Sequence, residues 1–143
     1  MGNIIYNSKT KFIKQDLNDY TTNVVTEAVL KTLEIEAGRA PNGFIVMATG
    51  RAKDNGTSTN AFIRIRAGNS STFSSNTLFK TINRMVTLAK DATLVHGWAM
   101  NVFVSPEDID LTQKVYVNIT GQNSVNAGGP NQLETFIILA VGE

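Results

Sequence analysis

The 143-residue chain contains no cysteine, a single histidine and only three prolines. The absence of cysteine excludes disulfides and thiolate metal ligands. No apolar run approaches the roughly 20 residues that a membrane-spanning helix needs, so we expect no membrane span. The GxSxG, HExxH and glycine-rich phosphate-loop motifs are also missing. With His96 as its one histidine, we predict that the chain is not an enzyme and that it holds no cofactor or metal ion.

The chain also has few charged residues and almost no excess of either sign. Charged residues make up 17% of the chain, the formal net charge is +1, and hydrophobic residues make up 42%. This balance is typical of one globular domain, and it provides no field that would draw the chain to nucleic acid. The polar residues are mostly neutral, with 15 asparagines and 16 threonines. Such a surface favours contacts made through hydrogen bonds, as in assembly or sugar binding.

Apolar and polar residues alternate over short segments, which indicates β-strands. Residues 61–66 place two isoleucines on one face and Arg64 and Arg66 on the other. Residues 44–48 are apolar on both faces, as a strand buried on both sides would be. These two runs flank a segment rich in turn-forming residues. We therefore predict that they pair as antiparallel neighbours across a turn at residues 54–56.

About seven to nine such strands, separated by Gly, Asn and Ser turns, predict an all-β antiparallel sandwich or jelly roll. We assign residues 28–143 to this domain and residues 1–27 to an N-terminal arm. Residues 22–37 fit two structures. We favour a strand over residues 29–37, but a helix over residues 22–33 also fits the spacing of the apolar residues. The arm is therefore either extended or partly helical.

The last strand, residues 133–141, is apolar on both faces after Thr135. A strand of this kind at the wet edge of a sheet would invite aggregation. We therefore expect the strand either to be central in its sheet or to meet a partner with its outer face.

Two aromatic residues are candidates for ligand contact. Trp98 and Tyr116 offer ring faces on which a sugar could stack, although a single aromatic residue in a strand usually packs in the core. Binding residues concentrate on loops that a rigid scaffold holds. The loops at residues 69–76 and 121–131 would carry such a site.

Two groups of charged residues also have structural explanations. Glu107, Asp108 and Asp110 are close in sequence, but calcium needs six to eight oxygen ligands and their spacing is not that of an EF-hand. We favour a solvated acidic turn. Arg64 and Arg66 lack interleaved aromatic residues that would stack nucleic-acid bases, so we favour a solvated or intersubunit face.

The chain contains, in order, the segments GFIVMATG, AFIRIRAG, RMVTLAKDATLVHGWAM, KVYVNITGQ and LETFIILAVGE. The order of these segments and their pattern of apolar and polar residues resemble the jelly-roll domains of the C1q/TNF-like type, particularly the small ones in virion proteins of tailed bacteriophages. The resemblance covers residues 29–143. It implies a homotrimer with the C-terminal strand near the threefold axis. The oligomer-interface residues on that strand would be Leu133, Phe136, Ile137, Ile138, Leu139 and Val141.

The resemblance also implies a function and a location. It implies a non-enzymatic structural protein of the bacteriophage virion, either a capsid decoration, a head-fibre or a tail-associated protein. The N-terminal arm would contact other virion proteins. The alternative is a module of a phage fibre that binds a glycan or a receptor on the host surface.

Overall fold

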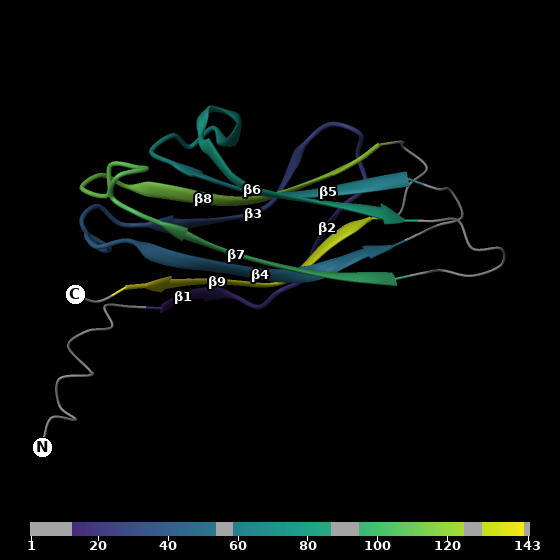
Figure 1. The fold of residues 1–143 in the computed structure, drawn as a ribbon, viewed down its shortest axis with the longest axis horizontal. Helices are drawn as coiled ribbons and strands as arrows, with labels where there is room; N and C mark the ends of the chain where they lie inside the picture. The colour runs from purple at the N-terminus through teal and green to yellow at the C-terminus, as the bar shows by residue number, and fades with distance from the viewer. Residues whose placement is uncertain (1–12, 54–58, 87–94, 125–129, 142–143) are drawn as a thin grey trace, which may run out of the picture.

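The computed structural model describes residues 13–53, 59–86, 95–124 and 130–141, which form two antiparallel sheets packed face to face (Figure 1). Sheet A has the order β1–β9–β4–β7, and β2 also pairs with β9. Its strands are β1 (Ile13–Asp16), β2 (Tyr20–Thr22), β4 (Phe44–Lys53), β7 (Val95–Val104) and β9 (Asn131–Ala140). Sheet B has the order β3–β8–β5–β6. Its strands are β3 (Ala28–Ile35), β5 (Thr59–Gly68), β6 (Thr77–Val86) and β8 (Val115–Asn123).

The strand pairs are nested along the chain. β1 and β2 pair with β9, β3 pairs with β8, β4 with β7 and β5 with β6. The pairs β4–β9 and β5–β8 then complete the two sheets. This is the topology of a jelly roll, in which one long antiparallel ribbon is rolled into a sandwich. The predicted all-β antiparallel jelly-roll sandwich is confirmed.

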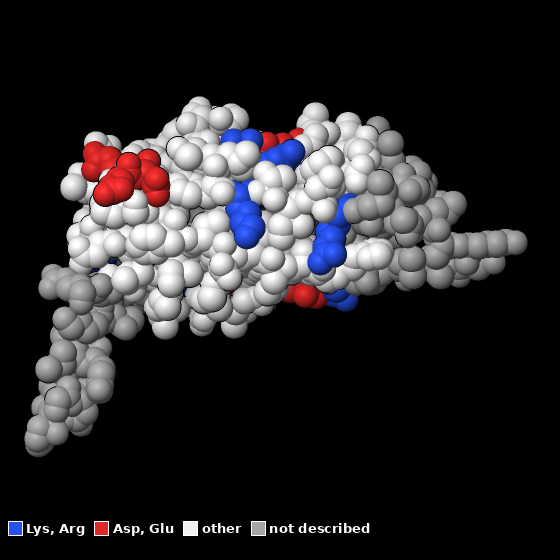
Figure 2. All heavy atoms as spheres, in the orientation of Figure 1, with Lys and Arg blue, Asp and Glu red and all other residues white. Residues whose placement is uncertain are grey.

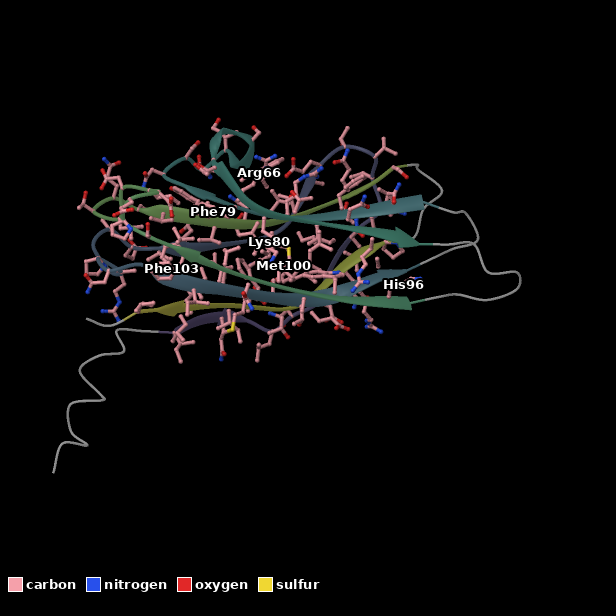
Figure 3. The ribbon with its side chains drawn as sticks, in the orientation of Figure 1. Arg66, Phe79, Lys80, His96, Met100 and Phe103 are labelled. Carbon is pink, nitrogen blue, oxygen red and sulfur yellow. The ribbon has the colours of Figure 1, made fainter. Side chains whose placement is uncertain are left out.

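The core lies between the sheets and follows from the alternation of side chains along each strand. Figure 3 shows Met100 of β7 in this space between the two sheets. Burial of large apolar side chains is the main favourable term in folding, at about 25 cal/mol per Å² removed from water. The largest fully buried side chains are Phe44, Val46, Ile63, Ile65, Val104, Val115, Val117, Ile119, Leu133, Phe136 and Ile138.

The expected pairing of residues 44–48 with residues 61–66 is wrong. The first run lies in β4 of sheet A and the second in β5 of sheet B. The predicted turn at residues 54–56 lies outside the described residues. The predicted alternation of residues 61–66 is confirmed, because Ile63 and Ile65 are fully buried. β4 is not buried on both sides within this chain, since Met47 on its outer face is 36% exposed.

The helix considered for residues 22–33 is wrong, and the favoured strand is confirmed with shifted bounds. β2 ends at Thr22 and β3 begins at Ala28. The alternation within β3 is interrupted by a register shift between Val29 and Lys31. Because of this bulge, Leu30 is buried while Val29 is 40% exposed. A bulge of this kind changes which residues face the core without changing the apolar content of the strand.

The segment that follows residue 12 joins the sandwich. β1 and β2 both pair with β9 in sheet A. Asp16 of β1 also links the two sheets, because its carboxylate lies 3.2 Å from the Lys31 ammonium of β3. The predicted boundary at residue 28 therefore falls between two strands of one sandwich. Residues 1–12, the rest of the predicted arm, lie outside the described residues.

Candidate functional site

The outer face of sheet A carries a continuous apolar row across four strands. Ile13 pairs with Leu139, Leu139 with Ile45, and Ile45 with Phe103. Directly paired residues in antiparallel strands place their side chains on the same face. Ile13 is 61% exposed and Phe103 is 51% exposed. These are large apolar side chains that the sandwich itself does not bury.

The next row along the sheet extends this surface. Ile137 of β9 pairs with Met47 of β4 on the same face. The row ends in two neutral polar residues, Gln15 of β1 and Asn101 of β7. We name the combined surface the apolar face. It consists of Ile13, Ile45, Met47, Phe103, Ile137 and Leu139.

Beyond the apolar face, sheet A carries an ion pair between neighbouring strands. Arg51 Nε of β4 lies 2.5 Å from Glu134 Oε1 of β9. Their side chains are 43% and 36% exposed, so water screens the pair. The two charges cancel.

The six interface residues predicted on the C-terminal strand fall on two different sides of β9. Leu133, Phe136 and Ile138 are fully buried in the core, so they cannot line a surface of this sandwich and the prediction is corrected for them. The outward-facing members of the set on the strand are Ile137 and Leu139, both half-buried, and Val141, also half-buried, follows the end of β9. Alternation separates Phe136 and Ile138 from Ile137 and Leu139. A register shift between Thr49 and Gly50 of β4 places Leu133 on the inner face together with Phe136.

The outer face of sheet B carries a charged network whose members pair with one another within the chain. Arg66 of β5 donates two hydrogen bonds to the carboxylate of Glu27, at 2.7 and 3.0 Å. The Thr120 hydroxyl donates a third, at 2.6 Å. Arg64 lies 3.9 Å from the same carboxylate and donates to Gln122 Oε1 at 2.8 Å. Figure 3 shows Arg66 on the side of sheet B that is turned away from sheet A.

This network shifts the ionisation of the groups that form it. Burial by itself would raise the pKa of Glu27, but the hydrogen bonds from Arg66 and Thr120 and the nearby positive charges lower that pKa below its ordinary value. Hydrogen bonding to Glu27 raises the pKa of Arg66 against the opposing effect of burial. Arg64 and Arg66 therefore lie on a paired, partly buried face, more enclosed than the solvated face that the sequence suggested.

The two predicted ligand-contact aromatics have different positions. Trp98 is only 4% exposed and packs in the core. Its ring lies over Gly50, where an added Cβ would come within 2.3 Å of the indole. Trp98 therefore cannot present a ring face to a sugar in this structure. Tyr116 is half-buried on the outer face of sheet B, and the Lys114 ammonium lies 5.5 Å from the centre of its ring.

The acidic loop between β7 and β8 forms hydrogen-bonded turns. Asp108 accepts hydrogen bonds from the backbone N–H and hydroxyl of Ser105. Asp110 accepts from the backbone and hydroxyl of Thr112 and from the Gln113 amide. Hydrogen bonds from Thr112, first of all its hydroxyl, lower the pKa of Asp110. Figure 2 shows acidic side chains gathered at the end of the molecule where β8 begins.

The described residues include no group of three or more His, Asp or Glu side chains that could hold a metal ion. His96 of β7 pairs with Ala52 near the other end of the sandwich. Its Nε2 is buried and has no hydrogen-bond partner among the described residues. Within the same residues, we find no helix with the length and apolarity to cross a membrane.

No protein-family model matches the chain, and no curated protein sequence matches it. Solved structures of infectious bursal disease virus share its fold. The chain superposes on the structure of the Gx strain with a TM-score of 0.50 and 11% identity, covering 91% of this chain and 32% of that one. The VP2 subviral particle of the same virus matches with a TM-score of 0.50 and 11% identity, covering 92% of this chain and 33% of that one. The T13 viral particle matches with a TM-score of 0.51 and 9% identity, covering 92% of this chain and 31% of that one.

At this identity, the likeness defines a class of fold, the jelly-roll β-sandwich found in viral capsid structures. The chain spans about a third of the length of those capsid chains. The closer resemblance to C1q/TNF-like domains of bacteriophages stays a prediction.

Sequence reasoning did not single out several residues of these two surfaces. Ile13, Ile45, Met47 and Phe103 come from three distant segments, and only strand register brings them together with β9. One local signal was available, since the two-sided apolar run of β4 matches the two-sided run of β9. Glu27 lies in the connection between β2 and β3, where no periodic pattern marks it.

Proposed function

We propose that this chain is a structural protein of a virus particle and that it assembles with copies of itself through the apolar face. The jelly-roll fold, shared with viral capsid structures, supports the first part. The exposed row of Ile13, Leu139, Ile45 and Phe103 carries the second. Obligate interfaces between subunits are more apolar than ordinary surfaces. A sheet face of this composition fits such an interface.

A second copy of the chain suits this face because the face carries no unbalanced charge. Its six members are apolar, its neighbours Gln15 and Asn101 are neutral, and Arg51 and Glu134 cancel. Identical copies can therefore approach without repulsion between like charges. A closed ring would also cover every copy of the face and prevent open-ended association. That the ring contains three copies is inferred only from the resemblance to C1q/TNF-like domains.

The finer proposal follows the same resemblance. We place the protein in the bacteriophage virion as a non-enzymatic capsid decoration, head-fibre or tail-associated component. Of the predicted arm, residues 1–27, the part that precedes β1 would supply the contact with other virion proteins, since β1 and β2 belong to sheet A. Antibodies raised against the purified chain should detect it in purified particles of the virus that encodes it. Its absence from those particles, with expression confirmed in infected cells, would contradict the virion location.

Solution mass tests the assembly directly. We expect light scattering to give 46.5 kDa, three times the 15.5 kDa chain. Ile137→Asp places a charge within the apolar face and should yield a folded 15.5 kDa monomer. The matched control is Leu78→Asp, because Leu78 of β6 is 45% exposed on the outer face of sheet B. The control should keep the wild-type mass. A wild-type monomer at every concentration, or dissociation by Leu78→Asp alone, would overturn the proposed interface.

A further inference from the structure

A cleft of about 430 Å³ opens between two loops at one end of sheet B. One wall comes from the connection between β5 and β6, including Ser70 and Ser75, and from Thr77, the first residue of β6. The other wall comes from the connection between β7 and β8, including Asp108 and Asp110. The cleft therefore joins the predicted ligand loop at residues 69–76 to the acidic loop, which sequence reasoning treated separately.

Two asparagine side chains hold these walls in place. Asn76 is buried, and its amide bridges its own loop by donating to the Ser70 carbonyl at 2.8 Å and accepting from the Ser70 N–H at 3.2 Å. Asn69 reaches across to the other loop and donates to the carbonyls of Asp110 and Lys114, at 2.9 and 3.0 Å. Both loops are thus fixed before any ligand arrives, and this reduces the entropy cost of binding.

Gly68 lies at the base of the cleft because no larger residue fits there. A Cβ at this position would lie 2.3 Å from Asn76 Oδ1. A side chain would therefore displace the amide that closes the loop. Gly68 also pairs directly with Tyr116 on β8. Among the described residues, however, Tyr116 is not one of those that line the cleft.

The groups that line the cleft determine the chemistry of a ligand. Ser75 and Thr77 present hydroxyls, which both donate and accept hydrogen bonds. Asp108 and Asp110 contribute ionised carboxylates, whose oxygens already accept hydrogen bonds within their own loop but retain further acceptor capacity. Such a surface can bond the hydroxyl groups of a polyol, whereas its negative charge repels anionic ligands. The lining also lacks the large apolar area that a hydrophobic ligand would need.

We propose that this cleft binds a neutral carbohydrate. Sugar hydroxyls would bond to Ser75, Thr77 and Asp108, and acidic sugars would be excluded. The cleft lies at the end of sheet B, whereas the apolar face lies on the outer side of sheet A. Figure 1 shows that the two sheets form separate layers. The inference therefore does not rest on the proposed assembly, and a monomeric variant should bind equally well.

The test uses the full chain and a panel of methyl glycosides. The panel contains neutral hexoses, N-acetylhexosamines, glucuronic acid and sialic acid, followed by saturation-transfer NMR and by titration. We expect at least one neutral glycoside to bind saturably and both acidic sugars to fail. The double variant Ser75→Ala, Thr77→Val should weaken binding about tenfold or more, because it removes two hydrogen-bonding hydroxyls.

Thr81→Val is the matched control, because Thr81 is an exposed threonine on the same strand, outside the cleft. It should leave binding unchanged. Three results would overturn the proposal: no binding by any neutral glycoside, equal binding by acidic sugars, or full binding by the double variant. The light-scattering result for Ile137→Asp is independent of all three.

Discussion

The outer faces of the two sheets carry different kinds of side chain, charged and paired on sheet B and apolar on sheet A. On sheet B, the arginines of β5 are paired with Glu27, and residues 23–27 fold back along β8. The backbone carbonyl of Val25 accepts from Gln122, and that of Val24 accepts from the Asn123 N–H. On sheet A, the corresponding surface consists of the apolar face. The arginines of sheet B are thus paired within the chain, although Val29 and Leu78 are exposed on that side, whereas the outer face of sheet A carries a continuous apolar row.

This difference separates two explanations for apolar residues on both sides of a strand. Burial within a sandwich explains the inner residues of β9, such as Ile138. It does not explain Ile137 and Leu139, which share the outer face with Phe103. Exposed patches of this kind on a folded protein usually mark interaction sites. Substitutions at neighbouring residues of β9, one facing the core and one facing outward, distinguish the two explanations.

The largest effect is expected from truncation of adjacent isoleucines on β9. Ile138→Ala removes a fully buried side chain and should lower the free energy of unfolding by about 2–5 kcal/mol. Ile137→Ala should lower the stability of the subunit by less than about 1 kcal/mol, but should weaken association. Urea unfolding at several protein concentrations measures both effects. Equal losses at the two positions, without any dependence on concentration, would show that Ile137 belongs to the core.

A smaller loss of stability is expected from a substitution in the charged network on the outer face of sheet B. Glu27→Gln removes the carboxylate that binds Arg66 and should cost about 1.5–3 kcal/mol of unfolding free energy. The exposed Glu107 supplies the control, and Glu107→Gln should change stability little.

The same variant has a defined pH dependence. The folded protein lowers the pKa of Glu27 below the ordinary value of 4.5, so the folded state binds this proton less tightly than the unfolded chain. The stabilisation is present above the unfolded pKa and is lost as pH falls through the folded pKa. The advantage of wild type over Glu27→Gln should therefore shrink as pH is lowered from about 6 to about 3. A constant difference across that range would contradict the role of the ionised carboxylate.

Local alternation predicted which residues of β5 face the core, because a period of two in sequence becomes two faces in a strand. It could not predict register. The turn composition at residues 54–56 suggested a hairpin, yet β4 and β5 lie in different sheets. Pairing in a jelly roll joins segments far apart in sequence, such as Ile13 and Leu139. No local pattern encodes such a contact.

Bulges account for a second group of errors. The shift in β3 exposes Val29 and buries Leu30, and the shift between β4 and β9 places Leu133 on the same side as Phe136. An unbroken period of two would assign Leu133 to the outer face with Ile137. Bulges depend on tertiary fit as well as on local preference. The predicted list of interface residues therefore mixed the two faces of β9, and the interface itself stays a prediction.

The smallest effect is expected from the ion pair on sheet A. Arg51 and Glu134 are both well exposed, so Glu134→Gln should change the free energy of unfolding by less than about 1 kcal/mol. The measurement is best made in the Ile137→Asp background, where association does not contribute, at low and at high salt. The small loss should disappear at high salt, because exposed charges are screened. A loss as large as that of Glu27→Gln, unaffected by salt, would mean that sheet A also completes its charged surface within the chain.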